Sequence, residues 1–191
     1  EAHPGVRQGK VITDYPVLEI VRVQLRGKLL EVIRKTVRLK GASDQQGAHL
    51  QYSWDFGDGS APATGTVTNK DVIEASHAYV GAVGQVWAAR LTVSNLSTGE
   101  TSNRAYLVEM KTKTQEVEAN VAIDEGLWYL HKTLYRTPSG CTDCGNWQAG
   151  GFAASGFHGV TAANLNAFMV NGHQEAGAAD NPYTDTVKRG M

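Results

Sequence analysis

The sequence predicts a β-sandwich followed by a short α-helical segment. Up to about residue 112, apolar residues recur at every second position in short runs separated by Gly, Pro and Asp, which is the pattern of strands joined by turns. From Glu116 onward the apolar period lengthens to about 3.6 residues, which is typical of helices. Net charge changes sign at the same place, because residues 1–115 carry 14 Lys and Arg against 11 Asp and Glu whereas residues 116–191 carry 4 against 8. We therefore expect an N-terminal arm at 1–16, a sandwich at 17–112 and a helical segment at 113–191.

Six or seven strands are expected at the spacing of a sandwich. The segments that alternate are 17–25, 29–40, 50–56, 71–80, 86–95 and 103–111. Arg26, Gly27 and Lys28 are expected to form the first turn. Residues 41–47, and the Pro-, Gly- and Thr-rich stretch after residue 60, are expected to be loops.

The most specific motif is the run Trp54, Asp55, Phe56, Gly57, Asp58 and Gly59. Trp54 and Phe56 share one strand face with the apolar residues before them, so both are expected in the core. The two glycines tolerate positive φ, and the Asp between them can accept hydrogen bonds from nearby amides. About twenty residues later the chain has His77 and Tyr79 in an H-x-Y pattern.

This combination resembles the polycystic-kidney-disease (PKD) domain, an immunoglobulin-like β-sandwich of extracellular proteins. The likeness covers about residues 17–112, and it implies that His77 and Tyr79 are core and corner residues rather than a catalytic pair. Two departures are visible: Trp87 stands where the family usually has Tyr, and Gly84 comes one residue early. A one-residue bulge would absorb that slip.

Asp55 and Asp58 are the candidates for a calcium site, since hard cations prefer clustered oxygen ligands. The alternative is that each carboxylate binds backbone amides of its own turn. We favour the alternative, because the motif offers only these two carboxylates and contains no DxDxDG loop. No other cofactor is expected.

Three helices are expected in the second segment, at about 117–136, 159–171 and 182–191. The first has an apolar stripe of Ile123, Leu127, Leu130 and Leu134 with Val121, Trp128 and Tyr135, and the second has Val160, Ala163, Ala167 and Val170 in phase. Asn181 as N-cap and Pro182 as first helical residue indicate where the third helix begins. The order of these pieces resembles one repeat of the α/α-toroid proteins, such as terpene cyclases and prenyltransferase β-subunits. The segment lacks the acidic and zinc-binding residues of those enzymes and looks incomplete as a toroid.

Cys141 and Cys144 form a CxxC pair in a glycine-rich loop. A disulfide that pins this loop is the interpretation we favour. A zinc site that adds two of His131, His158 and His173 is one alternative, and free or redox-active thiols are the other.

These observations favour a non-enzymatic extracellular or cell-surface module, structural or adhesive, that contacts protein partners or copies of itself. An assembling surface-layer or filament subunit is one form of this hypothesis. The alternatives are an accessory, substrate-binding part of a larger secreted hydrolase, for which carbohydrate is a conceivable partner, and a fragment of a toroid enzyme. Net charge of −1 suggests no nucleic-acid partner, and no apolar run is long enough for a membrane span. We expect a secreted chain from which a signal peptide has been removed.

Overall fold

The computed structural model describes residues 6–7, 19–25, 28–45, 49–136, 138, 141–147, 157–178 and 181–191. The chain divides into two compact units, Glu1–Ala122 and Ile123–Met191. The first unit is built of antiparallel β-sheets, and the second is helical.

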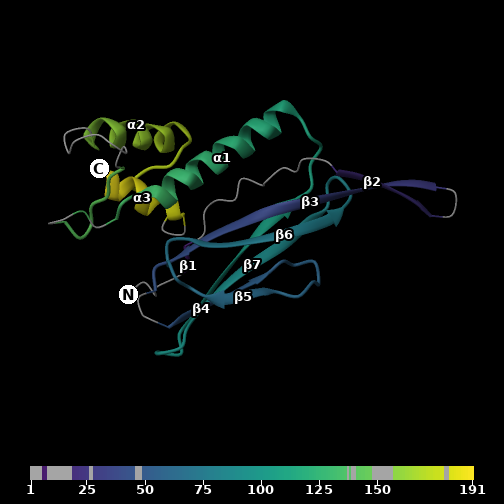
Figure 1. Ribbon diagram of the computed structural model, residues 1–191, viewed down its shortest axis with the longest axis horizontal. Helices are drawn as coiled ribbons and strands as arrows, with labels where there is room; N and C mark the ends of the chain where they lie inside the picture. Colours follow the sequence, from purple (N-terminus) through teal and green to yellow (C-terminus); the bar gives the residue numbers. More distant parts are fainter. Residues whose placement is uncertain are drawn as a thin grey trace. The chain divides into compact units, whose positions relative to one another are not determined.

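The first sheet is organised around β3, the longest strand. Its members are β1 (Val6–Arg7), β2 (Glu19–Leu25), β3 (Lys28–Ser43) and β6 (Ile73–Gly81). β2 pairs with β3 from Glu19 opposite Arg34 to Leu25 opposite Lys28, and β6 pairs with residues 33–41 of β3. The β2–β3 ribbon extends away from the other strands of this unit (Figure 1). Apart from β1, the predicted arm at 1–16 lies outside the described residues.

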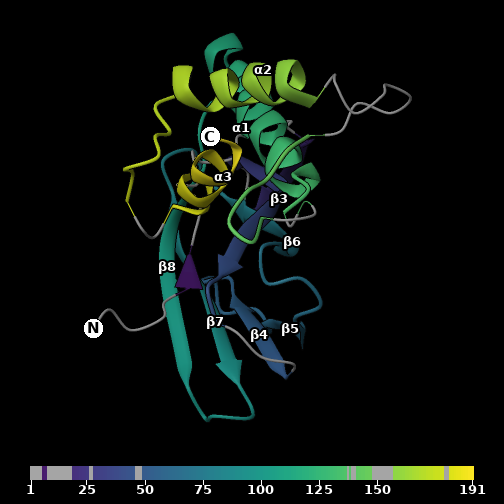
Figure 2. The ribbon, with the colours of Figure 1, turned by 90° about the vertical axis from the view of Figure 1, so that its left-hand side faces the viewer.

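The second sheet has the order β5-β4-β7-β8, which Figure 2 shows from one side. Its members are β4 (Leu50–Asp55), β5 (Ala63–Thr66), β7 (Val86–Asn95) and β8 (Thr101–Glu109). Every second residue of β7 from Trp87 to Asn95 is buried, as a strand with one covered face requires.

A single hydrophobic core joins the two sheets. It contains Val37 and Leu39 of β3, Ile73 and Tyr79 of β6, Leu50 and Trp54 of β4, Val108 of β8, and Trp87, Ala89, Leu91 and Val93 of β7. Because residues of both sheets meet in it, the arrangement of this unit is compatible with a β-sandwich-like fold. The predicted burial of Trp54 and Trp87 is confirmed.

Two stretches predicted as loops are strand. β3 continues through Gly41 to Ser43, and β5 lies within the predicted Pro/Gly/Thr loop. Both stretches contain a glycine that is required by packing: a Cβ on Gly41 would collide with Leu91, and one on Gly65 would lie 2.9 Å from the ring of Tyr52. Glycine here permits close approach within a strand and does not end it.

The helices are α1 (Gln115–Thr133), α2 (Phe157–Val170) and α3 (Pro182–Gly190). Asn181 caps α3 as predicted, since its side chain accepts a hydrogen bond from the Tyr183 amide and Pro182 begins the helix. Over the described residues, no helix is both long and apolar enough to cross a membrane. α1 ends at Thr133, before the predicted boundary near 136.

The predicted apolar faces of the first two helices are partly wrong. On α1 the buried residues are Asp124, Leu127, Trp128 and His131, whereas Ile123 and Tyr135 of the predicted stripe are exposed. On α2 the buried residues are Thr161 and Phe168, whereas Ala163 and Val170 are exposed. Polar residues that form hydrogen bonds and ring contacts inside the unit replace some of the aliphatic residues that the pattern predicted.

Candidate functional site

The turn after β4 is held by its own aspartates. The Asp55 Oδ1 accepts a hydrogen bond from the Gly57 amide at 2.9 Å, and the Asp58 Oδ1 accepts one from the Ser60 amide at 3.0 Å. Gly57 and Gly59 adopt positive φ of 72° and 83°. The chain can therefore reverse directly after Phe56, with both carboxylates used to fix the reversal.

β6 fastens this turn to the sandwich through the two residues of the H-x-Y pattern. His77 donates from Nε2 to Asp58 Oδ2 at 2.7 Å, and its ring stacks on Phe56 with centroids 3.9 Å apart. The hydroxyl of Tyr79, which is fully buried, donates to the Phe56 carbonyl oxygen at 3.0 Å. Tyr79 lies in the core, whereas His77 is half-buried beside the turn.

The electrostatics of the turn follow from these bonds. Burial alone would raise the pKa of Asp58, but hydrogen bonds from Ser60 and His77 outweigh it and lower that pKa from 3.8 to about 2. Burial raises the pKa of Tyr79, and the charges of Asp58 and Asp55 raise it further. Asp58 is therefore an anion and Tyr79 a neutral donor at neutral pH.

Ser60, His77 and Asp58 lie close together but do not form a catalytic relay. The Ser60 Oγ lies 3.4 Å from the same Nε2 that donates to Asp58. A serine–histidine–aspartate relay needs the two nitrogens of the ring to serve different partners, with one of them accepting the serine proton. Here one nitrogen meets both groups, and both contacts hold the turn.

The calcium candidates behave as turn residues. Asp55 and Asp58 each accept amide hydrogen bonds, and Asp58 also contacts His77. In the part of the chain that the structure describes, no three His, Cys, Asp or Glu side chains cluster as metal ligands would.

In the helical unit, Cys141 and Cys144 are joined by a disulfide, with Cα atoms 5.5 Å apart. The loop that they close is fastened to the end of α3. The Arg189 guanidinium donates to the Thr142 carbonyl at 3.1 Å, and the Gly145 amide donates to the Arg189 carbonyl at 2.6 Å. The interpretation that the disulfide pins this loop therefore fits the geometry.

The three histidines of the zinc alternative are not brought together. His131 is buried, stacks on Trp128 with centroids 4.7 Å apart, and lies 2.6 Å from the Thr186 hydroxyl. His173 meets Asn181 at 3.1 Å and packs edge-on against Tyr183. His158 is exposed on α2. With both thiols in the disulfide, the zinc interpretation is wrong for these residues.

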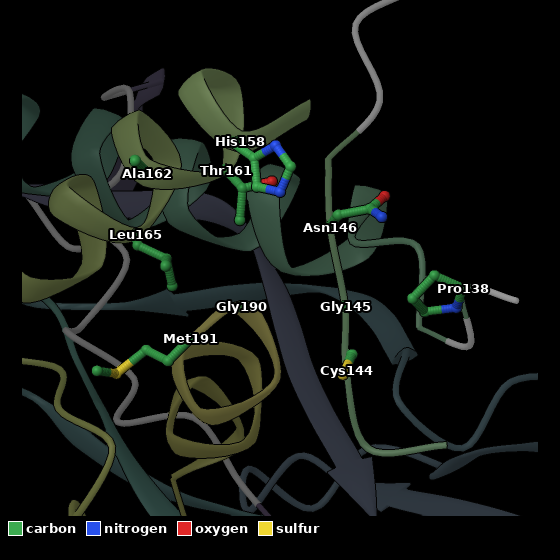
Figure 3. Close-up of a pocket in the computed structure, with 10 residues that line it drawn as sticks. All are labelled: Pro138, Cys144, Gly145, Asn146, His158, Thr161, Ala162, Leu165, Gly190 and Met191. Atoms are coloured by element: carbon green, nitrogen blue, oxygen red, sulfur yellow. The ribbon is translucent and has the colours of Figure 1, made fainter. Parts of the chain in front are cut away.

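A pocket of about 420 Å³ lies between α2, the disulfide loop and the end of α3 (Figure 3). Its polar residues, Asn146, His158 and Thr161, lie apart from the apolar Leu165 and Met191 in this view. The Thr161 hydroxyl already accepts a hydrogen bond from the Trp147 amide at 3.2 Å. The described lining includes no acidic residue, Lys or Arg, so the pocket offers apolar contact together with the polar groups of Asn146, His158 and Thr161.

The outer face of the second sheet carries a neutral polar surface. A shallow hollow of about 250 Å³ is lined on β4, β5 and β7 by Gln51, Tyr52, Ser53, Thr64, Gly65, Thr66, Thr92 and Ser94. Serine and threonine hydroxyls and the glutamine amide both donate and accept hydrogen bonds. The sequence analysis missed this surface, because its residues come together only through the pairing of three strands.

The β2–β3 ribbon has strand edges to which no other described strand pairs. Within the described residues, β2 pairs only with β3, and residues 28–32 of β3 pair only with β2. Ile33 and Arg34 are the positions of β3 that pair with both β2 and β6. Each open edge carries a row of backbone N–H and C=O groups that can accept another strand.

No family model, curated protein or solved structure matches this chain.

Proposed function

We propose that this chain is an extracellular or cell-surface structural module whose role is contact between proteins, and that its N-terminal unit is an immunoglobulin-like sandwich of the PKD type. The support for the fold type is the turn after β4, where Asp58, His77 and Tyr79 fasten the glycine reversal to β6. Asp58, His77 and Tyr79 are engaged in these structural bonds.

The observation that carries the proposed function is the open ribbon of β2 and β3. A two-stranded ribbon alone is marginally stable in water, because its backbone groups and one or both faces remain solvated. Addition of a strand from a partner would satisfy one edge and stabilise the ribbon, which is a common mode of protein recognition. The contact surface that we propose is therefore the edge of this ribbon.

Sedimentation velocity of the full chain, from low micromolar to several hundred micromolar, tests the proposal. We expect concentration-dependent association. Val23→Pro and Gln24→Pro form a matched pair, since consecutive amides of a strand point to opposite edges and only one of the two prolines removes an outward N–H. The proline at the outward amide should weaken association while Trp fluorescence shows an intact sandwich. A chain that stays monomeric throughout the range contradicts the proposal.

The extracellular setting is supported by the Cys141–Cys144 disulfide, because such bonds persist mainly in oxidising compartments. Alkylation of the protein purified from its native source, followed by mass measurement without reductant, should show no labelled cysteine. Two labelled cysteines would contradict this placement.

The neutral hollow on the second sheet favours a second candidate function, contact with a carbohydrate as an accessory part of a secreted hydrolase. Its hydroxyl and amide groups match the donors and acceptors of an uncharged polysaccharide. Affinity electrophoresis in gels that contain soluble neutral polysaccharides tests it. Retardation that Ser53→Val and Thr92→Val abolish would support this function, and unchanged mobility in all gels would exclude it for those polymers.

A further inference from the structure

We infer that the pocket between α2, the disulfide loop and the end of α3 binds a small, uncharged molecule that has an apolar body and a hydrogen-bond donor at one end. This site goes beyond the proposed contact function, because it lies within Ile123–Met191 and shares no residue with the β2–β3 ribbon. The observation that points to a ligand is a buried acceptor on a residue of the lining, the Oδ1 atom of Asn146.

The backbone of Asn146 is fixed, whereas the acceptor of its side chain is unused. The Asn146 amide donates to the Tyr135 carbonyl oxygen at 3.0 Å, and the Asn146 carbonyl oxygen accepts from the Tyr135 amide at 2.9 Å. The Oδ1 atom is buried and has no hydrogen-bond partner among the described residues. A buried acceptor that lacks a partner costs stability, because it has lost its water and gained nothing in exchange. A donor on a bound molecule would satisfy it.

Two further polar groups lie on α2 near Asn146. Figure 3 shows His158 and Thr161 next to each other on this helix, close to the stretch of chain that carries Asn146. The Thr161 hydroxyl accepts from the Trp147 amide and can still donate, and a neutral histidine ring both donates and accepts. These groups give the pocket a polar end that can bind a hydroxyl or an amide.

The rest of the described lining suits an apolar body. Ala162 and Leu165 continue along α2 beyond Thr161, and Met191 follows the last residue of α3. The volume of about 420 Å³ lies within the range of about 300–1,000 Å³ that is typical of small-molecule sites. A lining with a polar end and an apolar remainder matches a molecule of the same polarity.

The lining also restricts the charge of the ligand. Among the described residues it includes no Asp, Glu, Lys or Arg. A charged ligand would therefore lose hydration without gaining an ion pair with any of those four residue types. An uncharged donor, such as a hydroxyl group or an amide N–H, is the group that we assign to the polar end.

The walls of the pocket are held by bonds within the chain. The Gly145 amide donates to the Arg189 carbonyl oxygen at 2.6 Å, which ties the disulfide loop to the end of α3. The Trp147 side chain donates from Nε1 to the Leu130 carbonyl oxygen at 2.8 Å, which ties the following residues to α1. A ligand would thus enter a preformed site and would order little of the chain, which favours affinity.

A matched pair of probes tests the site on the full chain. p-Cresol and toluene share a ring and a methyl group, and only p-cresol has a hydroxyl donor. Titrations followed by the proton–nitrogen NMR signals of the Gly145, Ala162 and Gly190 amides give both dissociation constants. We expect these signals to shift, and we expect p-cresol to bind about fivefold to tenfold more tightly than toluene, because its hydroxyl satisfies Asn146. Asn146→Leu removes the acceptor at similar volume and should bring the two constants within about twofold of each other.

A second matched pair, on α2, distinguishes the pocket from non-specific binding. Ala162 and Ala163 are both exposed, but only Ala162 belongs to the described lining. Ala162→Phe should occupy the pocket and weaken both probes by about tenfold or more, whereas Ala163→Phe should leave both dissociation constants unchanged. Circular dichroism at 222 nm checks that every variant keeps the helix content of the parent.

The outcomes separate this inference from the proposed function. Equal affinity of the parent for p-cresol and toluene would overturn the assigned donor, and unchanged binding in Ala162→Phe would overturn the site. An absence of shifts with both probes would mean that water alone satisfies Asn146, and would overturn the inference as a whole. None of these results bears on association through the β2–β3 ribbon, which sedimentation measures separately.

Discussion

Gly57 and Gly59 adopt similar left-handed backbones, but their surroundings differ. A Cβ on Gly57 would collide with the carbonyl oxygen of Ala88, whereas one on Gly59 would meet nothing within 4 Å. Both positions penalise an L side chain through φ, and Gly57 also requires the missing Cβ for packing. Substitutions at Gly59 and at Gly57 therefore distinguish the cost of a left-handed backbone from the added cost of a steric clash.

We expect Gly59→Ala to lower the free energy of unfolding of the sandwich by about 1 kcal/mol, the cost of a left-handed alanine. Gly57→Ala should lower it by about 2–4 kcal/mol, because overpacking against β7 adds to that cost. Urea titrations followed by Trp fluorescence measure both. Equal losses in the two variants would show that the contact with Ala88 relaxes without cost.

Asp58 makes the stability of the sandwich depend on pH in the acid range. Its pKa is lowered from 3.8 to about 2 in the folded chain, so the unfolded state binds more protons between these values. The stabilisation is therefore complete above about pH 4 and is lost as pH falls towards 2. Asp58→Asn should be less stable than the parent at neutral pH, and the difference should shrink over this window. A difference in stability that stays constant down to pH 2 would contradict the lowered pKa of Asp58 in the folded chain.

At the scale of elements, α1 shows how a helix can bury polar residues on its core face. Asp124 and His131 lie on the same buried face as Leu127 and Trp128. This face follows the spacing i, i+3, i+4 and i+7, so its period is helical even though its composition is mixed. Hydrophobic periodicity alone selects a neighbouring stripe.

A matched pair on α1 tests the face. Leu127 is 3 % exposed and Ile123 is 41 % exposed, although both belong to the stripe predicted from the sequence. Leu127→Ala should destabilise the helical unit by about 2–5 kcal/mol through loss of burial and the cavity left behind. Ile123→Ala should change its stability by about 0.5 kcal/mol. Thermal unfolding followed by circular dichroism at 222 nm measures the stability of both variants. A larger loss of stability for Ile123→Ala than for Leu127→Ala would show that the face predicted from the sequence is the buried one.

Strand prediction succeeds where alternation is complete and fails where glycine interrupts it. The strand at 86–95 is confirmed at both ends, because every second residue of β7 is buried. Gly41 and Gly65 lie inside strands and were expected in loops. The reason for each glycine is an aromatic or aliphatic side chain on another strand, which the local sequence does not contain.

At the scale of the whole molecule, the chain forms two compact units, so we expect a mutation in one unit to leave the stability of the other unchanged. The disulfide and the hydrogen bonds that fasten its loop to α3 lie within Ile123–Met191. Replacing Cys141 and Cys144 together by Ser should lower the stability of this unit by about 2 kcal/mol, the loop entropy of a four-residue ring. Hydrogen exchange of core amides in β4 and β7 should not change. Faster exchange there in the double variant would show that the units unfold together.

The sequence by itself determined the elements whose signals are local. It determined the two kinds of segment, the positions of the helices and of the strands other than β1 and β5 to within a few residues, the Asn181 cap and the glycine–aspartate turn, since each depends on neighbours a few residues apart. Only the tertiary structure decided which face of α1 is buried, why Gly41 and Gly65 belong to strands, and how His77 and Tyr79 hold the turn. It also showed that, among the described residues, β2 pairs only with β3, and our proposed function depends on this edge. Burial and pairing of this kind are set by residues far away in the chain, and a local pattern carries no record of them.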